Sequence, residues 1–155
     1  SPSSFVQLPC FGLTMSKSNV FENDLLQLIF NAVPISNIAD NAGSAPLTEL
    51  HVALHTADPG EAGNQATSEC SYTGYSRIAV ARTSGGWTVT GDSVSPNADI
   101  DFPEATAGSE IATHASIGVA SSGSTKALYH GSIAPISIAP GVAPKLKQGS
   151  TITEN

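Results

Sequence analysis

Charged side chains are scarce in this sequence. Of its 155 residues only 12% are Asp, Glu, Lys or Arg, against roughly 25% in an average soluble domain. Six Lys and Arg stand against 13 Asp and Glu, for a net charge of −7, and the basic residues form no cluster. Because nucleic-acid binding depends on basic side chains that neutralise phosphates, we do not expect a nucleic acid as a partner.

Cysteines are few, and long apolar runs are missing. Cys10 and Cys70 allow one disulfide at most, and whether they pair stays open. Two cysteines are too few for a disulfide scaffold or for a zinc site built from repeated Cys pairs. No apolar run approaches the roughly 20 residues of a membrane-spanning helix, so we expect no membrane partner. The length suits one domain.

Residues 1–14 differ from the rest of the chain. They precede Met15, the sole methionine, so they are an arm or an extension upstream of a start at Met15. They lack the basic residues that begin a signal peptide, and none is expected. Two interpretations stay open: a disordered terminus, or an extended arm that lies on a neighbouring subunit through apolar side chains. Those side chains are Phe5, Val6, Leu8, Phe11 and Leu13, of which Phe5 and Phe11 are candidate interface residues.

Helical spacing of apolar residues occurs once, near the N-terminus. Ser18 or Asn19 can cap a helix from about Val20 to Ala32, and Pro34 stops it. After that the period changes to two, as in Glu49 to Thr56, where apolar and polar residues alternate as in a half-buried strand.

Further strands are expected between turns rich in Gly, Pro and Ser. Ser84-Gly85-Gly86 is read as a hairpin turn, and Gly91-Asp92-Ser93 as another turn. The expected strands are Arg77 to Thr83, Trp87 to Thr90, Asp99 to Phe102, Ala112 to Ala120, Lys126 to Ile133, Pro135 to Ile138 and Lys145 to Thr153. We therefore predict an all-β fold, a β-sandwich of jelly-roll type with one short N-terminal α-helix, in which residues 15–155 form a single domain.

Candidate chemical groups do not gather in the sequence. His51 and His55 lie four residues apart on a strand, about 13 Å, too far to share one zinc ion. His114 and His130 are on other strands, with no cysteine or clustered carboxylate beside them. Asp99 and Asp101 share a strand face and would suit acid/base chemistry, or a weak cation site with Glu104, only if a cleft enclosed them.

Catalytic and cofactor motifs are not visible. The block Gly91-Asp92-Ser93-Val94 resembles a hydrolase nucleophile motif, but it lies between two expected strands with no helix after it. A Gly-rich phosphate loop followed by Lys and Ser or Thr is missing. We therefore expect no enzyme, no cofactor and no metal site.

Five blocks of the sequence stand out together. They are LHTADPGEAG at 54–63, YTGYSR at 72–77, WTV at 87–89, NADIDFP at 97–103 and THASIG at 113–118. In order and spacing they resemble a family of small structural proteins in the virions of tailed phages. The resemblance spans about Met15 to Asn155.

The resemblance implies a capsid cement or decoration protein. Such a protein would bind the outside of the capsid and bridge neighbouring major capsid subunits, stabilising the shell against the pressure of packed DNA. Its expected partners are the major capsid protein and further copies of itself. Its location would be the capsid surface of the virion, after synthesis in the cytoplasm of the bacterial host.

Two alternatives are kept. One is a tail or neck component, such as a fibre, stopper or baseplate subunit. The other is a module that binds or cleaves a host glycan, favoured only if Asp99, Asp101 and Glu104 line a cleft.

Candidate contact residues follow from the expected binding role. Tyr72, Tyr75 and Arg77 are candidate anchors, because Tyr and Arg are enriched in interface hot spots. Ile136 and Ile138 are expected on an edge strand that could join two copies.

Overall fold

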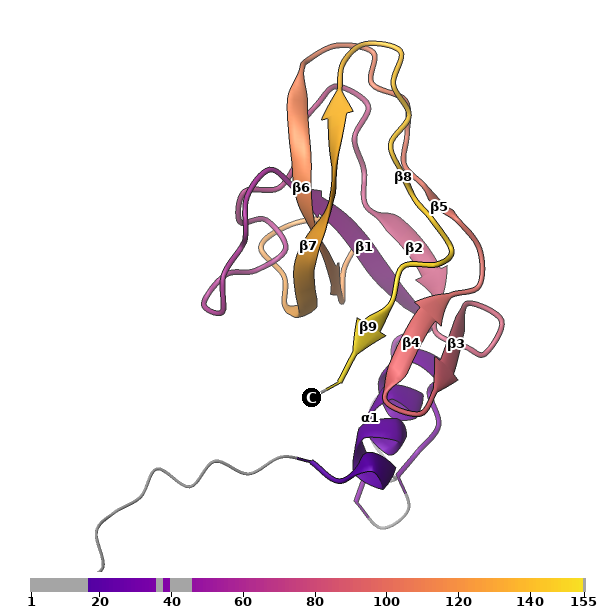
Figure 1. Ribbon diagram of the computed structural model, residues 1–155. Coiled ribbons are helices and arrows are strands. Elements are labelled where there is room, and N and C mark those ends of the chain that lie inside the picture. The colour runs from indigo at the N-terminus through magenta and orange to yellow at the C-terminus, as the bar shows by residue number, and fades with distance from the viewer. Residues whose placement is uncertain (1–16, 36–37, 40–45, 155) are drawn as a thin grey trace, which may run out of the picture.

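The computed structural model describes residues 17–35, 38–39 and 46–154 (Figure 1). The N-terminal residues 1–14, including Phe5 and Phe11, lie outside the described residues. Their role as an arm, and the division of the chain at residue 15, stay predictions.

One helix, α1 (Asn19–Asn31), forms where apolar residues recur at helical spacing. The Ser18 hydroxyl accepts a hydrogen bond from the backbone N–H of Phe21 at 3.3 Å, which caps the first turn. Ala32 ends the helix in the left-handed region, with φ at 57°. The Arg82 guanidinium donates to the carbonyls of Leu28 (2.6 Å) and Ile29 (2.7 Å), so a cation occupies the negative end of the helix.

The strands form three antiparallel sheets. The largest has the order β2-β1-β6-β7, and the other two are β3-β4-β9 and β5-β8. The expected all-β sandwich with one short helix is confirmed. The strands are β1 (Glu49–His55), β2 (Ile78–Ala81), β3 (Trp87–Thr90), β4 (Ser93–Pro96), β5 (Ile100–Asp101), β6 (Glu110–Gly118), β7 (Ala127–Ile138), β8 (Lys145–Leu146) and β9 (Ile152–Thr153).

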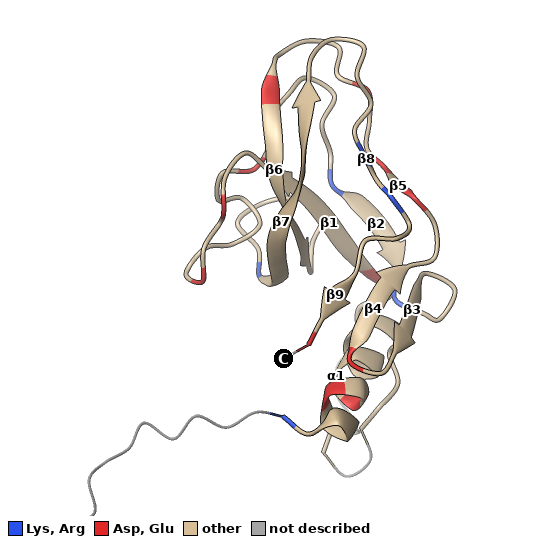
Figure 2. Cartoon of the chain, in the orientation of Figure 1, with Lys and Arg blue, Asp and Glu red and all other residues tan. Residues whose placement is uncertain are grey.

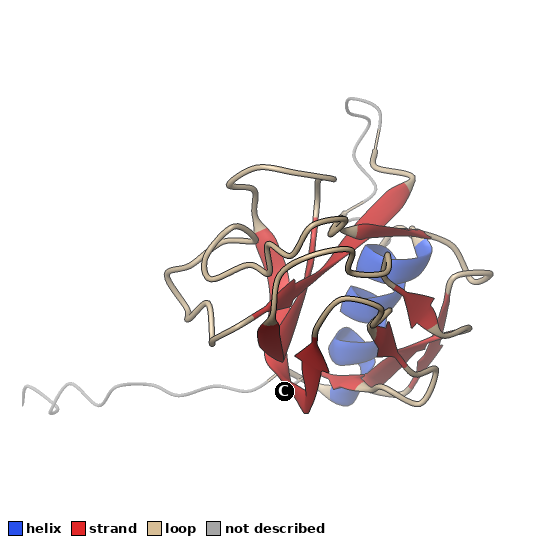
Figure 3. Ribbon diagram, turned by 90° about the horizontal axis from the view of Figure 1, so that it is seen from above, coloured by secondary structure: helices blue, strands red, loops and turns tan. Residues whose placement is uncertain are grey.

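A single apolar core joins the sheets to the helix. Phe30 of α1 packs edge to face against Trp87 of β3, with ring centroids 4.8 Å apart, and against Tyr129 of β7 at 5.7 Å. The helix lies beside β3 and β4 at one end of the molecule (Figure 1). Figure 3 shows that loops cover much of the opposite end. Other core residues include Leu26, Leu50, Val52, Leu54, Val94, Ile100, Phe102, Ile117 and Leu146.

The prediction of a hairpin at Ser84-Gly85-Gly86 is wrong. β2 pairs with β1, whereas β3 pairs with β4, so this turn carries the chain from one sheet to another. The backbone N–H groups of Gly86 and Trp87 both donate to the Thr83 carbonyl, at 3.0 and 3.1 Å. The tight hairpin lies at Gly91-Asp92 instead, where Gly91 has φ 60° and joins β3 to β4.

Two other expected boundaries also change. β7 is one continuous strand through Pro135, which lies on an edge strand and within the register shift between Ala112 and His114 of β6, where a proline is tolerated. The single strand expected from Lys145 to Thr153 is two short strands, β8 and β9, which belong to different sheets.

Replacing Gly86 should test the crossing between the sheets. A Cβ at this position would lie 2.1 Å from the backbone oxygen of Ala81, which cannot move without disturbing β2. We expect Gly86→Ala to lower the free energy of unfolding by about 1–3 kcal/mol in urea denaturation. The neighbouring Gly85→Ala is the control, because its Cβ would meet only the Thr83 hydroxyl, at 3.4 Å. Equal losses in the two variants would contradict the close approach.

Candidate functional site

All four histidines lie on the outer face of the largest sheet, opposite the core. The strand register places His55 directly across from His114 and places Ser116 across from His130. His51 is on the same face, four residues before His55 along β1. The segment after β1, residues 56–77, packs on this face through hydrogen bonds that its polar residues make to the sheet.

His55 and Ser116 form a buried pair under that segment. The Nδ1–H of His55 donates to the Thr67 carbonyl at 2.8 Å, so its Nε2 accepts from the Ser116 hydroxyl at 2.7 Å. Burial lowers the pKa of His55 below its ordinary value of 6.5, and the hydrogen bond to Thr67 opposes this shift only in part. The neutral imidazole therefore fits the site.

The His55–Ser116 pair has the spacing of a nucleophile and its base, but not the access. Ser116 is 1% exposed and His55 is fully buried. The amide Nε2 of the buried Gln65 lies 3.4 Å from the Ser116 hydroxyl and donates to the His51 carbonyl at 2.9 Å. The three side chains therefore fasten the segment to the sheet.

Arg77 and Glu69 form the strongest ion pair of the segment. The Arg77 Nε lies 2.7 Å from Glu69 Oε2, and its Nη2 lies 3.0 Å from Oε1, in bidentate geometry. The remaining guanidinium hydrogens reach the carbonyls of Ala120 (3.0 Å) and Gly123 (2.7 Å) and the hydroxyl of Thr125 (3.0 Å). One buried arginine thus joins residues 69–77 to the loop between β6 and β7.

Tyr75 and Tyr72 serve the same segment. The Tyr75 hydroxyl donates to Glu69 at 2.7 Å and accepts from the Leu54 N–H at 3.1 Å, and burial raises its pKa. The Tyr72 hydroxyl donates to the Pro103 carbonyl at 2.7 Å, and burial raises its pKa to about 12.

The structure thus turns several of the expected interface anchors inward. Tyr72 and Arg77 are buried by this chain's own residues, and Tyr75 is half-buried. Ile138 is buried in the core, whereas Ile136 is half-buried on β7. Tyr72, Arg77 and Ile138 therefore offer a partner little surface. Sequence reasoning missed their internal role because the enrichment of Tyr and Arg in interfaces says nothing about which way a side chain points.

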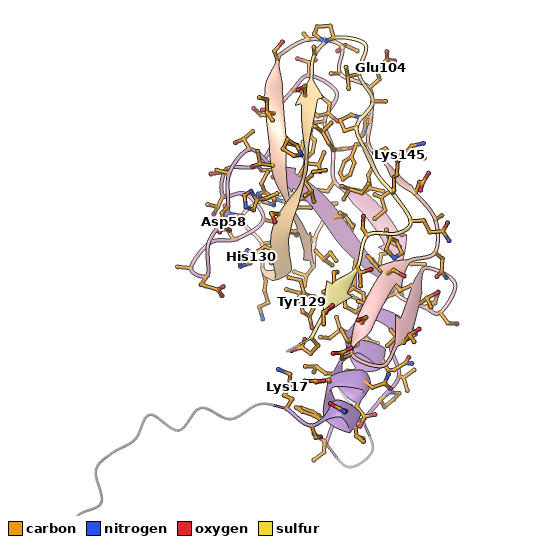
Figure 4. The ribbon with its side chains drawn as sticks, viewed as in Figure 1. Lys17, Asp58, Glu104, Tyr129, His130 and Lys145 are labelled. Atoms are coloured by element: carbon orange, nitrogen blue, oxygen red, sulfur yellow. The ribbon has the colours of Figure 1, made fainter. Side chains whose placement is uncertain are left out.

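The acidic residues considered for glycan chemistry do not share a cleft. Asp99 and Asp101 lie 3.6 and 3.5 Å from the ammonium of Lys145, and all three are exposed. Figure 4 shows Lys145 on the outside of the molecule and Glu104 nearer its upper end. Within the described part of the chain, no group of three or more His, Cys, Asp or Glu is placed to hold a metal ion.

His130 holds the turn after β1 against β7. Its Nδ1 lies 3.2 Å from the Asp58 carboxylate, and its Nε2 lies 3.6 Å from Glu61. The pKa of Asp58 is lowered first by the hydrogen bond from the Gly60 N–H and further by His130. Because both carboxylates are exposed, solvent screens these pairs, and they add little stability.

An apolar groove opens between β7 and strands β8 and β9. Its volume is about 690 Å³. One wall comes from the largest sheet through Tyr129, Ile133 and Ile136, and the other wall includes Leu146 and Ile152. Trp87 lies at its base, buried, with an indole Nε1 that has no hydrogen-bond partner among the described residues. The groove is an unfilled edge of the sandwich core.

β7 borders this groove as an edge strand. It pairs only with β6 among the described strands. None of its 12 residues is Lys, Arg, Asp or Glu. Edge strands usually carry charges that discourage further pairing, so this edge is open to added chain except at Pro135. Figure 2 shows β7 without Lys, Arg, Asp or Glu, whereas charged residues lie on α1 and around β5 and β8.

Comparison with known proteins places the chain among phage proteins. Residues 16–153 match the family model described as podophage GP4 fiber I protein gp80. No curated protein matches the chain. In the described part of the chain, no helix is long and apolar enough to cross a membrane. The match supports a structural protein of a phage virion, as the sequence blocks indicated.

The expected role as a capsid cement protein is wrong. The matching family is a fibre protein, which fits the tail alternative and not a place on the capsid surface. Low charge and small side chains suit any protein that is packed against others in a virion. These properties therefore could not distinguish a capsid protein from a tail protein.

Removing the Arg77 side chain should loosen the segment over the sheet. We expect Arg77→Ala to lower the free energy of unfolding by about 3–5 kcal/mol, because Glu69 and three backbone or hydroxyl oxygens lose a buried partner. Lys147→Ala, at an exposed position, should change it by less than about 0.5 kcal/mol. Chemical denaturation of both variants measures the difference, and a loss below 1 kcal/mol for Arg77→Ala would count against the network.

Stability should fall as the pH drops through the titration range of histidine. Because the folded-state pKa of His55 is lowered, the unfolded chain takes up a proton near pH 6.5 that the folded chain resists. The contribution of the neutral His55 to the free energy of unfolding is complete above that pH. It is lost as the pH falls towards the folded-state pKa. Urea unfolding at several pH values from 7.5 to 5 should show a decline that His55→Gln reduces. Ser116→Ala, which keeps the imidazole buried, should retain the decline in stability. An unchanged decline with pH in His55→Gln would refute the assignment of this effect to His55.

Proposed function

This chain belongs to the podophage GP4 fiber I protein family, and we therefore propose that it is a structural subunit of a podophage tail fibre. The observation that carries the proposal is the extent of the match, which covers residues 16–153 and so includes the whole described fold. The two smaller sheets, the helix and the covered sheet face all fall within it.

In this proposal the protein acts through contacts with other proteins and not through catalysis. The two arrangements closest to an active site have other roles in the fold. The His55–Ser116 pair is buried under residues 56–77. The carboxylates of Asp99 and Asp101 flank Lys145 on an exposed pair of short strands.

The contact surface that we propose lies around α1. Large apolar side chains that stay exposed are concentrated in the first third of the chain, where α1 and the following residues form one end of the molecule (Figure 1). Exposed apolar residues cost little in a fibre if a neighbouring subunit or another tail protein covers them. Those around α1 are Val20, Phe21, Val33, Ile38 and Leu47.

We expect copies of this protein and other tail proteins to be its partners. Virion proteins that repeat around a tail assemble with cyclic symmetry, in which each copy offers one patch to one neighbour. Each copy carries a net charge of −7, so a contact made by apolar side chains, with few charged residues in it, brings few like charges together.

Antibody labelling and electron microscopy of intact virions should locate the protein on the tail. We expect virions made with the double variant Val20→Asp and Ile38→Asp to carry about tenfold less of it, because two charges would be buried in the contact. These two side chains are 73% and 72% exposed, so the fold should tolerate the change.

The matched control for that experiment is Ile111→Asp. Ile111 is 52% exposed, and β6 begins at the end of the molecule away from α1 (Figure 1). Its level in the virion should be unchanged. Label on the capsid shell would overturn the fibre proposal, and equal levels of the double variant and the control would overturn the contact surface.

A further inference from the structure

The groove beside β7 has the features that an extended, uncharged stretch of polypeptide needs. Its walls are apolar, and among the described strands β7 has no partner along its outer edge. A chain that lay there would add a strand to the largest sheet and place alternate side chains into the groove. Trp87 also lines the groove, and its indole N–H has no acceptor among the described residues.

The described chain begins at one end of this groove. The ammonium of Lys17 lies 2.7 Å from Glu154 Oε1, and the hydroxyl of Tyr129 donates to Glu154 Oε2 at 2.6 Å. Tyr129 is a wall residue of the groove. Figure 4 shows Tyr129 at the lower end of β7 and Lys17 below it, beside α1. The residues before Lys17 therefore start beside the Tyr129 end of the groove.

The sequence of those residues matches the groove in character and in length. Residues 1–16 contain no Asp, Glu, Lys, Arg or His. Most of their apolar side chains lie between Phe5 and Leu13, and Met15 follows. At roughly 3.3 Å per residue, nine extended residues span about 30 Å, and the 12 residues of β7 span about 40 Å. Counted from Lys17 at the Tyr129 end, Leu13 lies about 13 Å along β7, near Ile133, and Cys10 lies about 23 Å along it, near Ile136. The residues before Cys10 continue towards the end of the strand.

We propose that residues 5–13 fill the groove between β7 and strands β8 and β9 of the same chain, running antiparallel to β7. The direction follows from the anchored end, because residue numbers fall along the segment as they rise along β7. The inference does not rest on the fibre function, since it concerns how one chain completes its own core.

Occupancy by the same chain follows from the position of Lys17. Three residues, 14–16, separate Leu13 from the anchored Lys17. A segment tethered so close to its site has an effective concentration in the millimolar range, far above that of a segment from a free second copy. A neighbouring chain would have to displace it.

Disulfide trapping tests both the site and the chain that fills it. Cys10 lies seven residues before Lys17, about 23 Å of extended chain, which is also the span from Tyr129 to Ile136. The full-length protein would carry Ile133→Cys or Ile136→Cys, each tested separately under mild oxidation. Cys70 should not interfere, because burial raises the pKa of its thiol to about 12. Ile111→Cys, on the outer face of the sheet, is the control.

We expect at least one of the two groove variants to form a disulfide with Cys10 within one chain. The product would migrate as a single chain on a denaturing gel without reductant, while the control would stay reduced. A crosslinked dimer would overturn occupancy by the same chain. The absence of a disulfide in both groove variants would overturn the proposal as a whole.

Hydrogen exchange provides a second test that needs no new cysteine. Deleting residues 1–14 should raise the exchange rates of β7 amides about tenfold or more and lower the melting temperature by about 4–8 °C. Gly131→Leu should reduce both effects of the deletion, because a side chain at Gly131 enters the groove. A Cβ there meets no atom within 4 Å, so this variant should fold. Unchanged β7 exchange after the deletion would overturn the proposal.

Discussion

The fold depends on the buried pair of Arg77 and Glu69. Residues 56–77 are rich in polar side chains and contain no long strand, so they cannot hold themselves to the sheet by apolar packing alone. The guanidinium makes six hydrogen bonds: two to Glu69, one to Gln65 and three to the loop before β7. Glu69 also accepts from the Tyr75 hydroxyl, which in turn accepts from the Leu54 N–H of β1. Arginine suits this place because its planar fork can satisfy a carboxylate and several carbonyls at once, which lysine cannot do.

The attachment of residues 56–77 determines which side chains on the outer face of the largest sheet meet solvent. The segment buries His55 and Ser116 and leaves His130 at the edge, where it contacts exposed carboxylates. The opposite face packs on the core, but the small sheets cover it only in part, because β5, β8 and β9 are two residues each. Strands this short cannot close a sandwich over a 12-residue neighbour, and the groove beside β7 is the consequence.

Local signals in the sequence predicted much of this fold. The single helix and the first strand follow from apolar spacing, with Ser18 as the cap. The pairing of strands was harder to predict. Ser84-Gly85-Gly86 has the composition of a hairpin turn, yet it joins two sheets. The strand with which each strand pairs depends on residues far away in the sequence. The inward roles of Tyr72 and Arg77 were hidden for the same reason, since their partners lie 31 and up to 48 residues away.

The same reasoning explains why the five sequence blocks predicted a virion protein correctly but did not predict its place in the virion. The block at 72–77 contains Tyr72, Tyr75 and Arg77, all of which hold residues 56–77 to the rest of the fold. Residues that maintain a fold do not show where the folded protein is assembled. The surface that distinguishes a fibre from a shell protein must lie elsewhere. The exposed apolar residues around α1 fit that requirement, because Val20 and Ile38 stay more than 70% exposed in the part of the chain that the structure describes.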